Sequence, residues 1–170
     1  IAKLSDSGHD VYTLILTEGC STQYSENEEI IDIKKEEANL ANEILGVKKV
    51  FFCDLPDMRL DSLDHVEINK NIEKYIEIIQ PDIVFTHHNG DVNKDHKLIF
   101  ESTLVATRPV LGSCVKKVYT YQVPSSTEWG APLENDVFIP NTFIDIEKYT
   151  DKKRLAIEAY KLELRDFPHP

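Results

Sequence analysis

Short β-prone runs alternate with segments of helical period along this sequence, and that alternation limits the fold more than any other feature. Residues 11–16, 50–53 and 83–85 are short apolar runs, typical of strands buried on both faces of a sheet. In residues 26–45 and 66–79, apolar side chains recur every three or four positions, which predicts amphipathic helices. Strands that alternate with helices favour an α/β fold with a mostly parallel sheet and helices on both faces.

Further segments extend this Rossmann-like arrangement. A first helix is expected to end near Gly8, and its start is expected upstream of Ile1. Because the last residues also stop without a cap, we expect one domain over residues 1–170, truncated at both ends. The remaining predicted elements are helices at 95–107 and 147–165 and strands at 117–123 and 142–146.

Charge and composition exclude several classes of protein. The net charge is −11, with 30 acidic and 19 basic residues, which argues against non-specific nucleic-acid binding. No apolar run approaches the roughly 18–20 residues that span a bilayer, and no signal peptide is recognised. The three cysteines are far apart, without the paired spacing of a zinc finger or a disulfide framework. We therefore interpret them as reduced thiols of a cytoplasmic protein. We expect no nucleic-acid or membrane partner. The sequence leaves open whether the protein forms a homo-oligomer.

The loop after Phe85 has the densest chemistry, and it falls where open parallel sheets bind ligands. Its histidines raise the prospect of a metal site above background, since neutral imidazole is a common ligand and an adjacent carboxylate can fix its tautomer. The alternative is a polar loop with solvated histidines in which Asp91 or Asn93 caps the next helix. The residues concerned are His87, His88, Asn89, Asp91, Asn93, Asp95 and His96.

The loop after Cys53 is the second candidate. Asp54, Asp57 and Arg59 could grip a hydroxyl-rich ligand through bidentate hydrogen bonds. The alternative is ordinary turn chemistry around Pro56. No glycine-rich dinucleotide or phosphate loop follows the first strand.

Motifs in this order resemble those of the LmbE-like (PIG-L) family of zinc-dependent N-acetylglucosaminyl deacetylases. The most specific is GDVNKDH with the strand before it, and FPHP at the end is the second. The matching segments are GHDVYTLILTEG, KKEEANLANEILG, DLPDMRLD, QPDIVFTHHNGDVNKDH, TRP, SSTEWG and YKLELRDFPHP.

The resemblance implies roles for particular residues. His96 would be a zinc ligand, with Asp95 as its neighbouring catalytic carboxylate and Asn93 lining the metal pocket. His169, in the terminal motif, would donate a proton or contact substrate. The residues implied to contact the sugar are Asp57, Arg59 and Lys34, the last standing where many members have arginine.

The resemblance also implies a mechanism and an absence. Zinc, or another divalent metal, would activate water to hydrolyse the N-acetyl group of a sugar or glycoconjugate, giving acetate and a free amino sugar. The family's first motif, His-Pro-Asp-Asp-Glu, supplies two zinc ligands and the general base, and it is not in this chain. As it stands, the chain is expected to bind zinc poorly.

Two rival functions remain at this point. One is a non-catalytic carbohydrate- or partner-binding domain that keeps the fold without the chemistry. The other is an unrelated Rossmann-like enzyme that uses Asp54, Asp57 and magnesium, although the phosphate-binding loop it would need is not found.

Overall fold

Parallel strand pairs joined by helices make up the computed structural model, which describes residues 1–24, 27–133 and 136–164. The chain forms two compact units: Ile1–Asp57 with the described residues from Asn141 onward, and Met58–Pro140. The first and second units each contain one parallel pair, β1–β2 and β3–β4 respectively. The mixed α/β class predicted from the alternation of strands and helices is confirmed.

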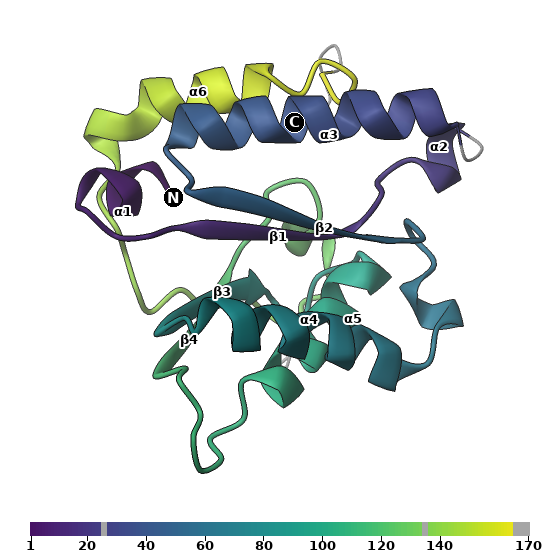
Figure 1. Cartoon of the computed structure of the whole chain (residues 1–170), viewed down its shortest axis with the longest axis vertical. Helices are drawn as coiled ribbons and strands as arrows, with labels where there is room; N and C mark the ends of the chain where they lie inside the picture. Colours follow the sequence, from purple (N-terminus) through teal and green to yellow (C-terminus); the bar gives the residue numbers. More distant parts are fainter. Residues whose placement is uncertain (25–26, 134–135, 165–170) are drawn as a thin grey trace. The chain divides into compact units, whose positions relative to one another are not determined.

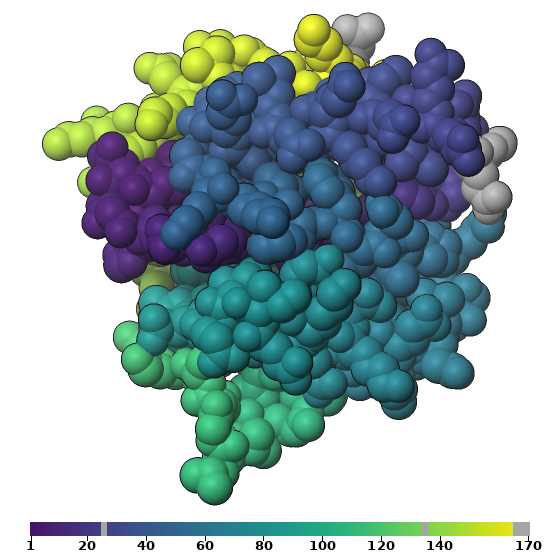
Figure 2. Space-filling view, viewed as in Figure 1, coloured from purple at the N-terminus to yellow at the C-terminus, as the bar shows by residue number. Residues whose placement is uncertain are grey.

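The first unit packs two helices beside its strand pair. Its elements are α1 (Ala2–Asp6), β1 (Tyr12–Thr17), α2 (Ser21–Tyr24), α3 (Glu28–Leu45), β2 (Lys49–Leu55), η3 (Glu147–Tyr149) and α6 (Thr150–Glu158). Helices α3 and α6 run side by side (Figure 1). Figure 2 shows the atoms of α6, in yellow, directly against those of α3.

Small side chains allow that close approach. Ala41 of α3 is buried with Ala156 and Ala159 of the C-terminal segment. A buried polar pair then fastens α3 to β1, where the Thr13 hydroxyl donates to Asn42 Oδ1 at 2.7 Å. Helix α3 ends at Gly46, whose φ of +76° is the left-handed conformation that glycine adopts at low cost.

The second unit carries the histidine-rich loop. Its elements are η1 (Leu60–Ser62), α4 (His65–Ile79), β3 (Ile83–His87), α5 (Lys94–Ala106), β4 (Lys117–Tyr121) and η2 (Thr127–Trp129). Helices α4 and α5 pack together, and α5 packs on β3. Leu60 and Ile68 are fully buried. The register of the strand pair places His87 beside Tyr121.

Most predicted elements agree with the structure within a few residues, but two at the C-terminal end are wrong. Residues 142–146 alternate like a strand, yet the structure has no strand there, and Phe143 is 82% exposed. The helix expected at 147–165 ends at Glu158. Beyond it the chain turns, because the Leu162 N–H donates to the Glu37 carboxylate of α3.

No helix in the described part of the chain is long and apolar enough to cross a membrane.

Candidate active site

The start of helix α5 fixes the position of His96. Asn93 caps this helix, and its Oδ1 accepts hydrogen bonds from the Asp95 N–H at 2.9 Å and the His96 N–H at 3.4 Å. The expectation that Asp91 or Asn93 caps the helix is therefore confirmed for Asn93. His96 stands in the first turn of α5, beyond the carboxyl end of β3, with 21% of its side chain exposed.

A fully buried carboxylate holds the His96 ring. Asp91 has no solvent exposure, and its Oδ2 lies 3.1 Å from His96 Nδ1. The hydroxyls of Ser126 and Thr127 each donate to the same oxygen at 2.8 Å. The N–H of Asn93 donates to Oδ1, also at 2.8 Å.

These hydrogen bonds decide the charge of Asp91. Burial raises the pKa of Asp91, but the hydrogen bonds from Asn93, Thr127, His96 and Ser126 outweigh it and bring the pKa below its ordinary value. Asp91 is therefore an ionised acceptor at neutral pH, and its partner nitrogen on His96 is a donor.

One face of the His96 ring is covered by a second imidazole. The rings of His87 and His96 stack with centroids 4.0 Å apart and an interplanar angle of 14°. Burial, and then the nearby His96, lower the pKa of His87 to about 4, so that His87 is neutral at neutral pH. Tyr121, whose pKa burial raises to about 12, places its hydroxyl 3.1 Å from His87 Nε2.

His88 takes no part in this cluster. It is buried, its Nε2 lies 3.0 Å from the carbonyl oxygen of Asp136, and its ring meets Phe138 edge-on. His88 therefore joins the loop after β3 to the segment around residue 136, and the idea that all three histidines are solvated is wrong.

Two glycines let this segment approach the loop closely. A Cβ on Gly90 would lie 1.7 Å from the carbonyl oxygen of Asp136, and one on Gly130 would lie 2.3 Å from the carbonyl oxygen of Gly90. Neither position has room for a side chain. The segment after β4 is thus seated directly on the loop that carries Asp91.

Asp95 is buried but turned elsewhere. Its Oδ1 accepts from the Leu60 N–H of η1 at 3.2 Å, and burial raises its pKa. Within the described residues, Asp91 rather than Asp95 binds the His96 ring. Arg59 lies in the same unit as an exposed residue directly before η1.

Two residues implied to contact a sugar lie in the first unit, around the loop after β1. The Glu18 carboxylate accepts from the Asp57 N–H at 3.1 Å, and the Thr17 hydroxyl donates to Asp57 Oδ1 at 3.3 Å. Lys34 donates to the carbonyl oxygen of Gly19 and pairs with Glu163 at 2.5 Å. Both Asp57 and Lys34 therefore support this loop.

The sequence-predicted residues thus fall into separate groups. Asn93, Asp95 and His96 lie together in the second unit, and Asp57 and Lys34 in the first. His169 lies outside the described residues. Residues that were given no individual role in the site from the sequence are His87, Asp91, Tyr121, Ser126 and Thr127. His87 and Asp91 belong to the loop that the sequence singled out, and Ser126 and Thr127 belong to the matching segment SSTEWG, whereas Tyr121 carried no signal.

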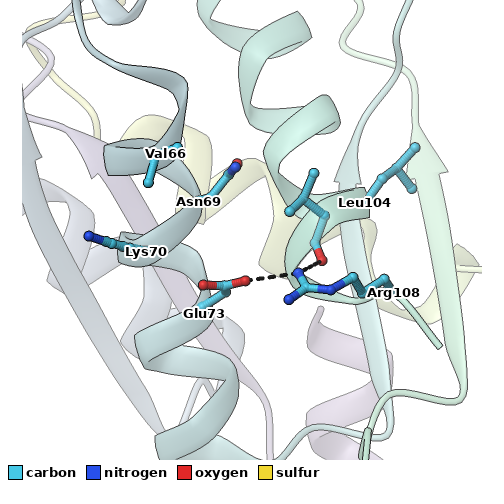
Figure 3. A pocket seen from close by; sticks show the side chains of 7 residues that line it. Val66, Asn69, Lys70, Glu73, Leu104 and Arg108 are labelled. Carbon is cyan, nitrogen blue, oxygen red and sulfur yellow. Dashed lines mark hydrogen bonds and ion pairs between the residues drawn. The ribbon is translucent and has the colours of Figure 1, made fainter. Parts of the chain in front are cut away.

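A groove elsewhere in the second unit contains none of these residues. It lies between α4 and α5 and has a volume of about 570 Å³ (Figure 3). Its polar feature is the ion pair of Arg108 and Glu73, at 3.0 Å. The lining residues are Val66, Asn69, Lys70, Glu73, Leu104, Val105 and Arg108.

Residues 1–107 match the protein family described as PIG-L, GlcNAc-PI de-N-acetylase. A relative named uncharacterized deacetylase YaiS, from Escherichia coli K12, is 26% identical over 95% of this chain and 80% of its own.

Solved structures have the same fold. The N,N'-diacetylchitobiose deacetylase of Pyrococcus horikoshii matches with a TM-score of 0.72 at 21% identity, over 97% of this chain and 64% of its own. The conserved protein TT1542 of Thermus thermophilus matches at 0.71 and 20% identity, over 94% and 69%. GalB, the 4-carboxy-2-hydroxymuconate hydratase of Pseudomonas putida KT2440, matches at 0.68 and 25% identity, over 93% and 69%.

The fold predicted from the sequence, Rossmann-like α/β, is confirmed by these neighbours. The chain spans 64% of the length of the archaeal deacetylase. Because the family match covers more than half of the sequence, and includes the motif that ends in Asp95 and His96, the chain belongs to the PIG-L family.

Proposed function

We propose that the protein hydrolyses the N-acetyl group of an N-acetylglucosamine-type sugar or glycoconjugate, releasing acetate and a free amino sugar. The observation that carries the proposal is the place of His96, which lies in the first turn of α5 beyond the carboxyl end of β3 with 21% of its side chain exposed. Neutral imidazole is a common metal ligand, and open parallel sheets bind their ligands beyond the carboxyl ends of their strands. The family match supports the same chemistry.

Zinc is the cofactor that we propose, and the described residues supply part of its site. His96 has the chemistry of a ligand, but the described residues contain no group of three or more His, Cys, Asp or Glu that could hold a metal ion. A zinc site needs at least three protein ligands. His96 is therefore proposed as one ligand of a set that the described residues do not complete. Bound zinc would supply a Lewis acid that polarises the N-acetyl carbonyl and activates water near neutral pH.

The polar residues near His96 have proposed roles that follow from their contacts. Asn93 uses Oδ1 to cap α5, so its Nδ2 group is the part that we propose contacts the substrate. Asp95, whose burial raises its pKa, is proposed to support catalysis from beside the ligand. A role for His169 in proton donation remains a prediction.

Sugar contacts are proposed for the other three residues. Asp57 and Arg59 both lie on the stretch of chain that joins β2 to η1, and carboxylate and guanidinium groups both bind sugar hydroxyls through directed hydrogen bonds. Lys34 already binds Gly19 and Glu163, so a sugar contact by Lys34 would replace one of these partners.

Acetate release from N-acetylated sugars tests the proposal. We would incubate the protein with N-acetylglucosamine, N,N'-diacetylchitobiose and a lipid-linked N-acetylglucosamine, and measure acetate together with new primary amine. The 170-residue chain is compared with a version that includes any coding sequence upstream of Ile1. Equal amounts of acetate and amine are expected from the form that binds zinc. Zinc-loaded protein without either product would overturn the proposal.

Replacing His96 tests its place as a zinc ligand. In the form of the protein that binds zinc, His96→Ala is expected to abolish tight zinc binding while leaving the fold intact, since the side chain is partly exposed. The matched control is His65→Ala, because His65 is an exposed histidine in the first turn of α4. Zinc per chain is measured by elemental analysis and the fold by circular dichroism. Unchanged zinc content in His96→Ala would remove the ligand assignment.

A hydratase is the second candidate, favoured by the similarity to GalB at 25% identity. A hydratase adds water across a double bond and releases no acetate. A parallel incubation with 4-carboxy-2-hydroxymuconate therefore separates the two, with loss of the ultraviolet absorbance of this unsaturated compound as the hydratase signal. A non-catalytic carbohydrate-binding domain would give neither signal but would still bind the sugar in calorimetry.

A further inference from the structure

The carboxylate of Asp91 collects three side-chain donors on a single oxygen. Ser126 Oγ and Thr127 Oγ1 lie 2.8 Å from Oδ2, and His96 Nδ1 lies 3.1 Å from it. The backbone N–H of Asn93 holds the other oxygen. With both oxygens bound and no exposure to solvent, the carboxylate has one orientation.

The two hydroxyls that orient Asp91 are themselves held in place by other contacts. Ser126 and Thr127 lie at the start of η2, where their backbone N–H groups donate to the Val123 carbonyl oxygen at 3.0 and 2.9 Å. The Thr127 hydroxyl also accepts the Val123 N–H at 2.7 Å, which fixes it before it donates to Asp91. The hydroxyls therefore act as fixed donors that aim the carboxylate at His96.

The ring of His96 is restrained on two sides. Asp91 holds its edge at Nδ1, and the stacked ring of His87 covers one face with centroids 4.0 Å apart. The hydroxyl of Tyr121 lies 3.1 Å from Nε2 of His87 and limits rotation of that ring in turn. Turning the His96 ring out of its plane would break the stack with His87, and a half-turn about the same torsion would move Nδ1 away from Asp91.

We propose that Asp91, aimed by the hydroxyls of Ser126 and Thr127, is the positioning residue that keeps His96 in its Nδ1–H tautomer with Nε2 as the ligating atom. The proposal rests on the proposed function in taking His96 as a metal ligand. It assigns to Asp91 the support that the sequence had suggested for the adjacent Asp95, whose carboxylate binds the Leu60 N–H.

The tautomer of His96 in solution is the direct test. In long-range ¹H–¹⁵N spectra recorded at a pH where the ring is neutral, the unmodified protein is expected to show protonated Nδ1 and bare Nε2. The His96 signals are assigned by their loss in His96→Ala. In Asp91→Asn, the amide NH₂ group is a donor where the carboxylate oxygen accepted hydrogen bonds from Ser126, Thr127 and His96. The preference of His96 for the Nδ1–H tautomer is therefore expected to disappear. This measurement needs no metal.

Metal affinity gives a second readout in the form of the protein that binds zinc. Loss of a partner behind a metal-binding histidine typically weakens metal affinity by about 10–100-fold. Asp91→Asn is expected to fall within that range by competition with a chelator. Ser126→Ala removes one aiming hydroxyl and leaves the Asp91–His96 contact, so a smaller loss and an unchanged tautomer are expected.

A destabilised control separates positioning from a general loss of stability. Thr103→Val breaks the buried hydroxyl pair of Thr86 and Thr103, at 3.2 Å, in the same unit. It is expected to lower the urea midpoint while leaving the tautomer and the metal affinity unchanged. If Asp91→Asn does not fold, Ser126→Ala combined with Thr127→Val replaces it, and a mixed tautomer is expected.

Two results would overturn the proposal. One is an Nε2–H tautomer in the unmodified protein, and the other is an unchanged tautomer in a folded Asp91→Asn variant. Neither depends on acetate release, so failure of this proposal is distinct from failure of the deacetylase proposal. Absence of any deacetylase activity would leave the expected tautomer as it is.

Discussion

At the scale of single residues, Gly90 shows how little freedom the loop after β3 has. Its α-carbon faces the backbone of Asp136, and a β-carbon there would stand 1.7 Å from the carbonyl oxygen. Backbone cannot move aside as a flexible side chain can. Gly90 is therefore required by the neighbouring segment rather than by its own conformation.

Gly90→Ala should destabilise the protein because of this clash. Overpacking typically costs about 1–3 kcal/mol, and a contact with backbone belongs at the upper end of that range. The control is Gly112→Ala, where nothing lies within 4 Å and only the φ of +89° opposes a side chain. Urea unfolding followed by circular dichroism measures both variants. Equal or smaller destabilisation by Gly90→Ala would contradict the explanation.

Sequence alone located the site but not its internal contacts. The clustering of polar residues after Phe85 indicated where chemistry would gather, since ligands bind beyond the ends of parallel strands. The sequence did not show which carboxylate binds the His96 ring. Asp91 and Asp95 are both nearby in the sequence, and only the contacts of each carboxylate distinguish them. The hydroxyls that hold Asp91 come 35 and 36 residues later, and no local pattern reveals such a pair.

At the scale of elements, caps decide where the helices that carry the site begin. Asn27 caps α3 and Asn93 caps α5, each by accepting backbone N–H groups on its side-chain oxygen. The two caps use the same chemistry. Only the second has His96 among its donors.

Replacing each cap in turn separates stability from site geometry. Asn27→Ala and Asn93→Ala should each cost about 1 kcal/mol, the usual effect of losing an asparagine cap. Asn93→Ala should in addition weaken metal binding, because the His96 N–H loses its acceptor. Urea midpoints and chelator competition measure the two effects. Equal metal affinity in both variants would show that the cap does not position His96.

The elements that the sequence predicted well are those whose own pattern determines them. Helix α3 has a long apolar stripe, an asparagine at its start and Gly46 at its end, and its predicted bounds hold within two residues. Residues 142–146 alternate as clearly as a strand, but a strand also needs a partner to bond with. Phe143 and Ile144 are exposed instead, at 82% and 51%. An alternating sequence shows that a segment could form a strand, but it does not show whether a partner strand is available.

At the scale of the whole molecule, the ionisation of the Glu18 carboxylate makes the free energy of unfolding depend on pH in the acid range. Glu18 accepts the N–H groups of Cys20 at 2.7 Å, Ser21 at 3.3 Å and Asp57 at 3.1 Å. Burial raises the pKa of Glu18, but hydrogen bonds from Ser21, Cys20 and Asp57 outweigh it and bring the pKa below its ordinary value of 4.5.

The sign of the resulting effect follows from linkage. Because folding lowers the pKa of Glu18, its contribution to the free energy of unfolding is complete above about pH 4.5 and is lost as the pH falls through the folded value. Glu18→Gln should lower stability at pH 7 and flatten its decline in acid. Urea midpoints of both proteins, measured from neutral pH down into acid, test this. Parallel curves would show that Glu18 does not contribute to the acid dependence.

The distance along the chain between Asp91 and its hydroxyl partners has a consequence for biosynthesis. Ser126 and Thr127 are made 35 and 36 residues after Asp91, so a nascent chain holds His96 long before it holds the groups that aim its supporting carboxylate. Bringing residues 126 and 127 back to Asp91 closes a long loop, which has an entropic cost. The packing of η2 against the loop between β3 and α5 contributes to offsetting that cost. The orientation of the imidazole by Asp91 and both hydroxyls is therefore complete only after Thr127 has been made and η2 has packed on the loop between β3 and α5.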